Sequence, residues 1–152
     1  SVKVLGWDIA KQDGTFSGDF SDQTKGASIA KSMADEGADI IFPVAGPVGL
    51  GSSQFAMDSA GAVKIIGVDV DMSISNPTQA EVYVASVLKK IDAAVLQAVK
   101  DALAGSGGGT DYLGTLENGG VGVAITSTVA PELQAELDAV AAGIIDGSIV
   151  TK

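Results

Sequence analysis

Two aspartates and a glycine-rich turn are the residues of this chain best suited to binding a small molecule. Asp69 and Asp71 follow the apolar run 63–68, and the glycine-rich turn begins at Gly46, after the apolar run 39–44. A glycine turn lets backbone N–H groups approach a ligand at the N-terminus of a helix. Two such strand ends side by side outline a small-molecule site at the edge of an open parallel sheet.

The composition excludes several other classes of site. The chain has 152 residues, nine lysines, no arginine and a formal net charge of −10. Nucleic-acid binding is disfavoured, because phosphate contacts need clustered basic residues. Cysteine and histidine are absent, which excludes a thiol nucleophile, a histidine base and a Cys/His metal site. We expect no cofactor. An enzymatic alternative remains, in which Asp69 and Asp71 hold Mg²⁺ for phosphoryl transfer.

The first half of the sequence predicts the elements that position these residues. A helix should begin after Asp22, a suitable N-cap, and end near Glu36. A shorter helix is expected near 49–60, with Phe55 and Ala56 turned inward. Strands are predicted at 2–7, 39–44 and 63–68, the second of them buried on both faces. Strands that alternate with helices indicate an α/β fold with an open parallel sheet flanked by helices.

The second half predicts a different pattern. Apolar residues at helical spacing indicate one long helix over 78–104, followed by a glycine turn at 105–109. A last helix should run from Pro131 to about Gly147. Two further strands, 111–116 and 121–125, are expected to flank a hairpin-like turn at 117–120.

Five segments, in this order, resemble the BMP (basic membrane protein) family, the PnrA-like substrate-binding lipoproteins of ABC transporters. They are 20–26, 37–46, 67–71, 86–92 and 119–122. The resemblance implies a type I periplasmic-binding-protein clamshell, in which two α/β lobes close on a ligand. It also implies that the protein is not an enzyme. The function implied is binding of a nucleoside, chiefly a purine nucleoside, and its delivery to a membrane permease.

The resemblance further implies how the chain is divided. The chain looks like the C-terminal half of a family member, with 1–72 and 126–152 mainly in the second lobe. Residues 73–125 would include the hinge crossing, at about 72–82, and part of the first lobe. The missing N-terminal half, or a second copy of the chain, would cover the exposed core. The full-length form would be extracytoplasmic and membrane-anchored through a lipid that this chain lacks.

The resemblance also assigns binding roles. Phe20 would stack on the base, Gly46 would contact the sugar through its backbone, and the Asp69 carboxylate would accept hydrogen bonds from the ribose cis-diol. Lys89, on the polar side of the predicted long helix, would reach a sugar hydroxyl and pair with Asp69. Weaker candidates are Asp71, Trp7, Phe16 as a rival to Phe20, and Lys90 as a rival to Lys89.

Each of these residues also has a plain structural interpretation. Phe20 could be a loop residue docked on the core, Gly46 a turn residue, Asp69 or Asp71 a cap, and Lys89 a solvated lysine. Trp7 is more simply explained as a core or lobe-edge residue. A ligand-sensing regulatory module of the same fold is the main functional alternative to transport. The sequence does not separate these two functions.

Overall fold

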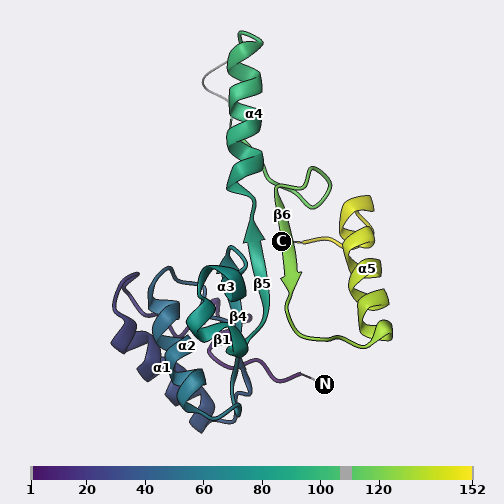
Figure 1. The fold of residues 1–152 in the computed structure, drawn as a ribbon. Helices are drawn as coiled ribbons and strands as arrows, with labels where there is room; N and C mark the ends of the chain where they lie inside the picture. Colours follow the sequence, from purple (N-terminus) through teal and green to yellow (C-terminus); the bar gives the residue numbers. More distant parts are fainter. Residues whose placement is uncertain (1, 107–110, 152) are drawn as a thin grey trace.

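The computed structural model describes residues 2–106 and 111–151, which form an α/β fold (Figure 1). The elements in chain order are β1 (Trp7–Asp8), β2 (Asp13–Gly14), α1 (Gln23–Asp35), β3 (Ile40–Ile41), α2 (Val48–Asp58), β4 (Lys64–Asp69), α3 (Met72–Ser75), the 3₁₀ helix η1 (Pro77–Val82), β5 (Tyr83–Lys89), α4 (Ile91–Leu103), β6 (Val121–Ile125) and α5 (Pro131–Asp146).

The main sheet has the strand order β3-β4-β5-β6. The strands β3, β4 and β5 are mutually parallel, as predicted, whereas β6 runs antiparallel to β5. The sheet is therefore mixed. The carboxyl ends of β3, β4 and β5 all meet at one edge, where ligands bind in open α/β sheets.

The helices α1 and α2 pack side by side and follow the predicted bounds closely. The side chain of Asp22 accepts a hydrogen bond from the backbone N–H of Lys25 at 3.0 Å, so the predicted N-cap of α1 is confirmed. Gly26 of α1 and Gly51 of α2 allow the close approach, because a Cβ on either would overlap the backbone of the other helix. This pair forms a closely packed layer beside the sheet.

The buried core lies between α2, β4 and the start of β5. Its fully buried members are Ala56, Val63, Ile65, Val82 and Tyr83. Phe55 packs partly buried against this cluster, so the inward orientation predicted for Phe55 and Ala56 is confirmed.

The single helix predicted over 78–104 is wrong. Residues 77–82 form η1, 83–89 form β5, and only 91–103 form a helix, α4. The segment 83–89 pairs with both β4 and β6, and Ser86 at its centre is fully buried. Tertiary pairing on two sides therefore outweighs the helical spacing of its apolar residues.

Three predicted strands are also shortened or lost. In the segment 2–7 only Trp7 is in a strand, and it pairs antiparallel with β2. The segment 39–44 contributes only Ile40–Ile41 at the sheet edge, and Ile40 is 50% exposed, so burial on both faces is wrong.

The segment 111–116 forms no strand. The side chain of Asn118 bonds instead to the backbone of Leu113 and Thr115, which confirms a turn but not a hairpin. The predicted glycine turn at 105–109 lies mostly outside the described residues, which stop at Ser106 and resume at Asp111.

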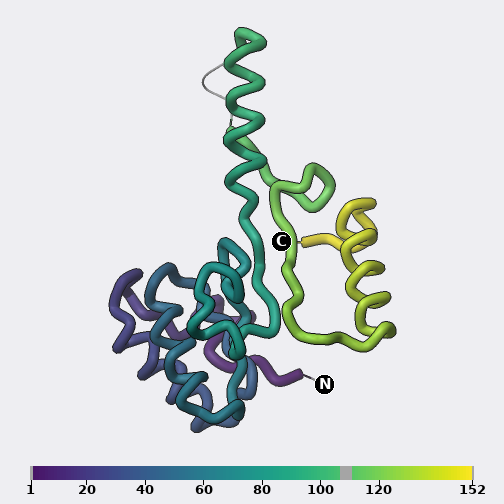
Figure 2. The backbone as a smooth tube through the Cα atoms, in the orientation of Figure 1, coloured from purple at the N-terminus to yellow at the C-terminus, as the bar shows by residue number. Residues whose placement is uncertain are grey.

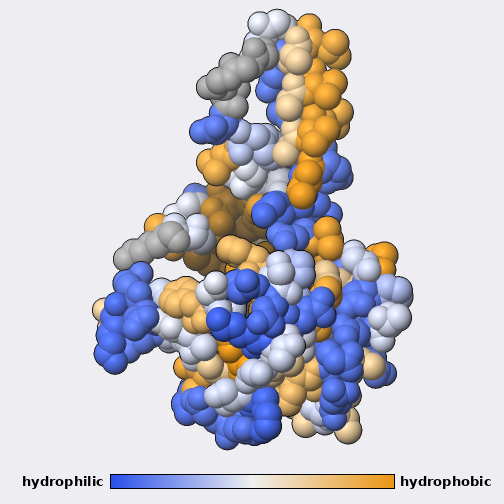
Figure 3. All heavy atoms as spheres, turned by 90° about the vertical axis from the view of Figure 1, so that its left-hand side faces the viewer, coloured by the Kyte–Doolittle hydropathy of each residue, from blue (hydrophilic) through white to orange (hydrophobic). Residues whose placement is uncertain are grey.

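Two helices stand apart from the packed layers. The helix α4 rises away from the sheet beyond β5, and α5 lies to the side of β6 (Figures 1 and 2). Figure 3 shows an apolar stripe along α4, whose exposed residues are Ile91, Val95, Leu96, Val99 and Leu103. In the part of the chain that the structure describes, no helix combines the length and the apolar character needed to cross a bilayer.

Candidate functional site

Three predicted site residues meet at the carboxyl edge of the parallel strands. Gly46 lies in the turn between β3 and α2, Asp69 is the last residue of β4, and Lys89 is the last residue of β5. Asp69 of β4 is in register with Leu88 of β5. Lys89, which follows Leu88, therefore lies next to Asp69 across the two strands. The Lys89 Nζ atom is 3.2 Å from Oδ1 of Asp69. The predicted pairing is present, although Lys89 is on a strand and not on a helix.

Asp69 is held in an unusual backbone conformation. Its φ angle is +70°, and the Val70 N–H donates to the Val68 carbonyl at 2.9 Å across it. This is a γ-turn of the rare positive-φ kind, which is strained for a residue with a side chain. The turn ends the strand abruptly and places the carboxylate at the edge of the sheet.

The ion pair is open to solvent. The side chains of Asp69 and Lys89 are 52% and 67% exposed, so their attraction is screened and adds little to stability. Its consequence is orientation, because the ammonium holds the carboxylate at the mouth of the site. A carboxylate has room to accept further hydrogen bonds from ligand hydroxyls.

A cavity of about 240 Å³ lies next to this ion pair. Its lining includes the exposed residues Gly46 and Asp69, which mark its mouth, and the buried residues Ile65, Ser53 and Tyr83, which mark its floor. The remaining lining residues are mostly apolar: Pro43, Pro47, Gly49, Leu50, Gly67, Val68, Val70 and Met72. The site is therefore a largely apolar hollow with a paired acid and base at one side, an arrangement typical of small-molecule sites.

Phe20 is near the site but outside this cavity. Its carbonyl accepts a hydrogen bond from the Val48 N–H at 3.1 Å, which joins the loop to the first turn of α2. Its side chain is 73% exposed and does not line the cavity. The ring is thus not docked on the core, and the Phe20 Cβ lies 3.9 Å from where a Cβ on Gly46 would be.

The weaker candidates lie outside the cavity. Oδ1 of Asp71 accepts hydrogen bonds from the N–H and the hydroxyl of Ser73 and caps α3. Trp7 packs edge-on against Phe16, with ring centroids 6.3 Å apart. Lys90 is the N-cap residue of α4 and is exposed. None of these four side chains lines the cavity.

The magnesium alternative finds no geometric support. Asp69 is paired with Lys89, and Asp71 is engaged by Ser73. Within the described ranges 2–106 and 111–151, no three acidic, histidine or cysteine side chains gather as metal ligands would.

Sequence reasoning missed Ser53 and Tyr83, which are 1% and 4% exposed. Their hydroxyls are 2.8 Å apart. A strand assignment for 83–89 would have pointed to Tyr83, because β5 must then lie beside β4.

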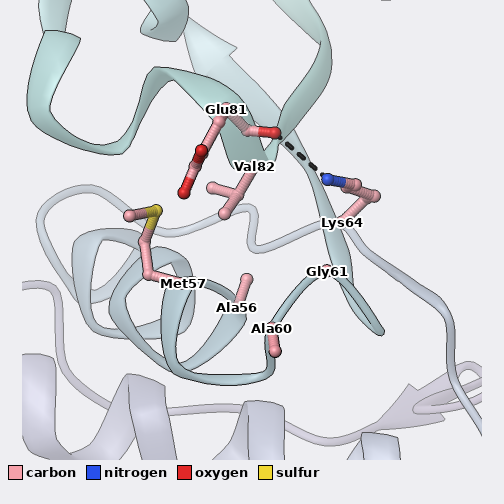
Figure 4. A pocket seen from close by; sticks show the side chains of 7 residues that line it. All are labelled: Ala56, Met57, Ala60, Gly61, Lys64, Glu81 and Val82. Atoms are coloured by element: carbon pink, nitrogen blue, oxygen red, sulfur yellow. Dashed lines mark hydrogen bonds between the residues drawn. The ribbon is translucent and has the colours of Figure 1, made fainter.

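A second hollow, of about 230 Å³, lies at the opposite end of β4 (Figure 4). Lys64 at the first position of β4 donates to the Glu81 carbonyl at 3.2 Å across it. It holds none of the predicted site residues, so the two hollows are separate features.

Comparison with known families decides the assignment. The family described as ABC transporter substrate-binding protein, PnrA-like (Bmp), matches residues 13–152. The chain belongs to this family. This match confirms the resemblance found in the sequence. Members of the family are substrate-binding components of ABC transporters, which are not enzymes.

Individual relatives agree with this assignment. The chain is 30% identical over 152 residues to the ABC transporter nucleoside-binding protein BmpA of Lactococcus lactis subsp. cremoris, covering 91% of this chain and 43% of the relative. It is 36% identical over 105 residues to basic membrane protein D of Borreliella burgdorferi, covering 67% of this chain and 30% of the relative.

Solved structures confirm the fold. An ABC transporter solute-binding protein of Aeropyrum pernix K1 superposes with a TM-score of 0.71 at 25% identity, over 91% of this chain and 46% of that one. This neighbour, a solute-binding protein, has the periplasmic-binding-protein fold. This PnrA-like chain therefore spans less than half the length of these relatives.

Proposed function

We propose that this PnrA-like chain supplies one wall of a nucleoside-binding cleft in an extracytoplasmic ABC-transporter subunit. The observation that carries the proposal is the convergence of Gly46, Asp69 and Lys89 at one sheet edge, beside an apolar cavity. The name of the Lactococcus lactis relative supports a nucleoside as the ligand class.

The ribose would bind at the mouth of the cavity. The Asp69 carboxylate would accept two hydrogen bonds from the cis-diol, a charge-assisted arrangement that is stronger than neutral hydrogen bonds. Lys89 would hold the carboxylate in place and offer a donor to the sugar. Gly46 permits a close backbone approach.

The base would stack on Phe20. A free aromatic ring on the rim suits a flat ligand group, and stacking contributes roughly 1–3 kcal/mol per base. We propose a purine, because the larger ring system covers more of the aromatic face.

The remaining apolar surface calls for a second polypeptide surface. The exposed apolar stripe of α4 is a contiguous patch, unlike the singly scattered apolar residues that are normal on a monomer. Ile40 is also exposed at the edge of the sheet. In the proposed division, 1–72 and 126–152 belong mainly to the second lobe. Residues 73–125 include the hinge crossing and part of the first lobe. The other half of a full-length protein would cover the stripe, and the closed form would dock on a permease.

The test is isothermal titration of this chain with inosine, guanosine, uridine and ribose, repeated with Asp69→Asn. Asparagine tolerates positive φ, so the variant removes the charge without adding strain. We expect Asp69→Asn to weaken purine-nucleoside binding by roughly 10–100-fold, because hydrogen bonds to a charged group contribute about 1.5–3 kcal/mol.

Asp71→Asn is the matched control. It makes the same change two residues away, on a side chain that caps α3, and should stay within about twofold of wild type. The proposal fails if Asp69→Asn binds as well as wild type, or if the wild-type chain binds no nucleoside when the other half of the cleft is supplied. A larger loss in Asp71→Asn would move the sugar contact to Asp71.

A further inference from the structure

The two hydroxyl groups on the floor of the cavity beside Asp69 both donate hydrogen bonds within the protein. The Ser53 hydroxyl donates to the Gly49 carbonyl at 3.0 Å. In the 2.8 Å contact between Ser53 and Tyr83, the donor must then be Tyr83. Asn76 donates to the Tyr83 oxygen at 3.2 Å. The chain of hydrogen bonds has one direction, and it leaves no hydroxyl proton on the floor for a ligand.

The rest of the cavity offers little to a polar group. Its other lining side chains, Asp69 at the mouth excepted, carry no polar atom, and no lysine lines it. A ligand hydroxyl that entered would give up its hydrogen bonds to water and would meet no side-chain donor to replace them. A phosphate would enter beside the Asp69 carboxylate, and no lysine lines the cavity to offset the repulsion. The cavity therefore suits an apolar, uncharged group.

The positions of Phe20 and Asp69 indicate which part of a nucleoside would enter. Phe20 does not line the cavity, whereas Asp69 does. Gly46 lies between them, because it lines the cavity and also lies against the Phe20 backbone. With the base on Phe20 and the diol on Asp69, the remaining substituent of the ribose, at C5′, is the one left to face the cavity.

We infer that the cavity is a subsite for an apolar 5′ substituent, with Ser53 and Tyr83 as its specificity-determining floor. The inference rests on the proposed nucleoside function. It predicts that 5′-deoxy-5′-thioalkyl nucleosides bind more tightly than the 5′-hydroxyl parent, and that 5′-phosphates are rejected.

The test is titration of the wild-type chain with adenosine, 5′-deoxy-5′-methylthioadenosine and adenosine 5′-monophosphate. We expect the methylthio compound to bind about tenfold more tightly than adenosine, because a hydroxyl is replaced by buried apolar atoms. The monophosphate should bind at least about tenfold more weakly. Equal or tighter binding of adenosine than of the methylthio compound overturns the subsite and leaves the nucleoside function standing. Failure of all three ligands to bind when the other half of the cleft is supplied overturns both.

Two serine variants test the role of the floor. Ser53→Ala removes the acceptor of Tyr83, so the phenol proton is freed to donate to a 5′-hydroxyl. The methylthio preference should then fall to about twofold. Ser52→Ala is the matched control, because Ser52 is equally buried on α2 but donates to the Gly26 carbonyl and does not line the cavity. It should keep the tenfold preference. An unchanged preference in Ser53→Ala would refute the role of Ser53 and Tyr83. If that variant does not fold, the comparison of ligands on wild type still decides the subsite.

Discussion

Gly51 lies where α2 crosses α1, and its replacement by alanine should force the two helices apart. The added Cβ would lie 2.6 Å from the carbonyl carbon of Gln23 and 2.9 Å from its Cα, and it would overlap the carbonyl oxygen. Ordinary contacts of a Cβ are 3.4–4 Å. Because the obstacle is backbone, no side-chain rotation relieves the overlap.

The expected loss follows from two opposing terms. Overpacking of a well-packed contact costs typically about 1–3 kcal/mol, and a clash with backbone belongs at the upper end. The higher helix propensity of alanine stabilises the folded state by up to about 1 kcal/mol and offsets part of this loss. We therefore expect Gly51→Ala to lower the free energy of unfolding by about 2 kcal/mol.

Gly49→Ala is the matched control on the same helix. The nearest atom to its added Cβ is the Pro43 Cγ at 3.4 Å, which is an ordinary contact. This variant should be between neutral and about 1 kcal/mol more stable. Urea unfolding followed by far-UV circular dichroism measures both variants, with the m-value unchanged. A loss below about 0.5 kcal/mol in Gly51→Ala, or an equal loss in Gly49→Ala, would refute the close crossing of the helices.

Two further predictions concern acidic residues just before the first turn of α1. Asp22→Ala should lower the free energy of unfolding by about 1 kcal/mol, because it removes the N-cap hydrogen bond from the Lys25 N–H. As a control in the same urea assay, Asp35→Ala breaks only an exposed ion pair and should change the free energy of unfolding by less than about 0.5 kcal/mol. Hydrogen bonds from the backbone N–H groups of Ser21 and Asp22 lower the pKa of Asp19 below 3.8. The stabilisation is therefore present above the unfolded pKa and is lost as the pH falls through the folded one, so Asp19→Asn should weaken the acid dependence of stability below about pH 4. An NMR titration that places the pKa of Asp19 at or above 3.8 would contradict this.

Local signals in the sequence were sufficient for the helices α1, α2 and α5. Asp22 caps α1 through a bond to a residue three positions away, and Gly147 ends α5 with a φ of +81°. Such signals act within one turn of helix, so no knowledge of the fold is needed to interpret them. The same holds for β4, whose apolar run is bounded by a glycine turn and an aspartate.

The prediction for the segment that forms β5 failed for the opposite reason. Its apolar residues also fit a helical period, and nothing local distinguishes the two. What decides is the pairing of Ser86 and Val87 with β4 on one side and β6 on the other, from residues more than 15 positions away. The same pairing places Lys89 beside Asp69, so the candidate ion pair was predicted correctly from family resemblance while its element was predicted wrongly.

The backbone at Asp69 supports the proposed ligand-binding role of its carboxylate. A positive φ costs a residue with a side chain roughly 1–3 kcal/mol, and glycine would adopt the same γ-turn without that strain. The side chain contributes little in return, because it is half exposed and its ion pair with Lys89 is screened by solvent. Packing therefore does not explain an aspartate at this position. A carboxylate held at the mouth of an apolar cavity is explained if it contacts a ligand, and this is the physical reason for preferring Asp69 over Asp71, whose carboxylate is already used to cap α3.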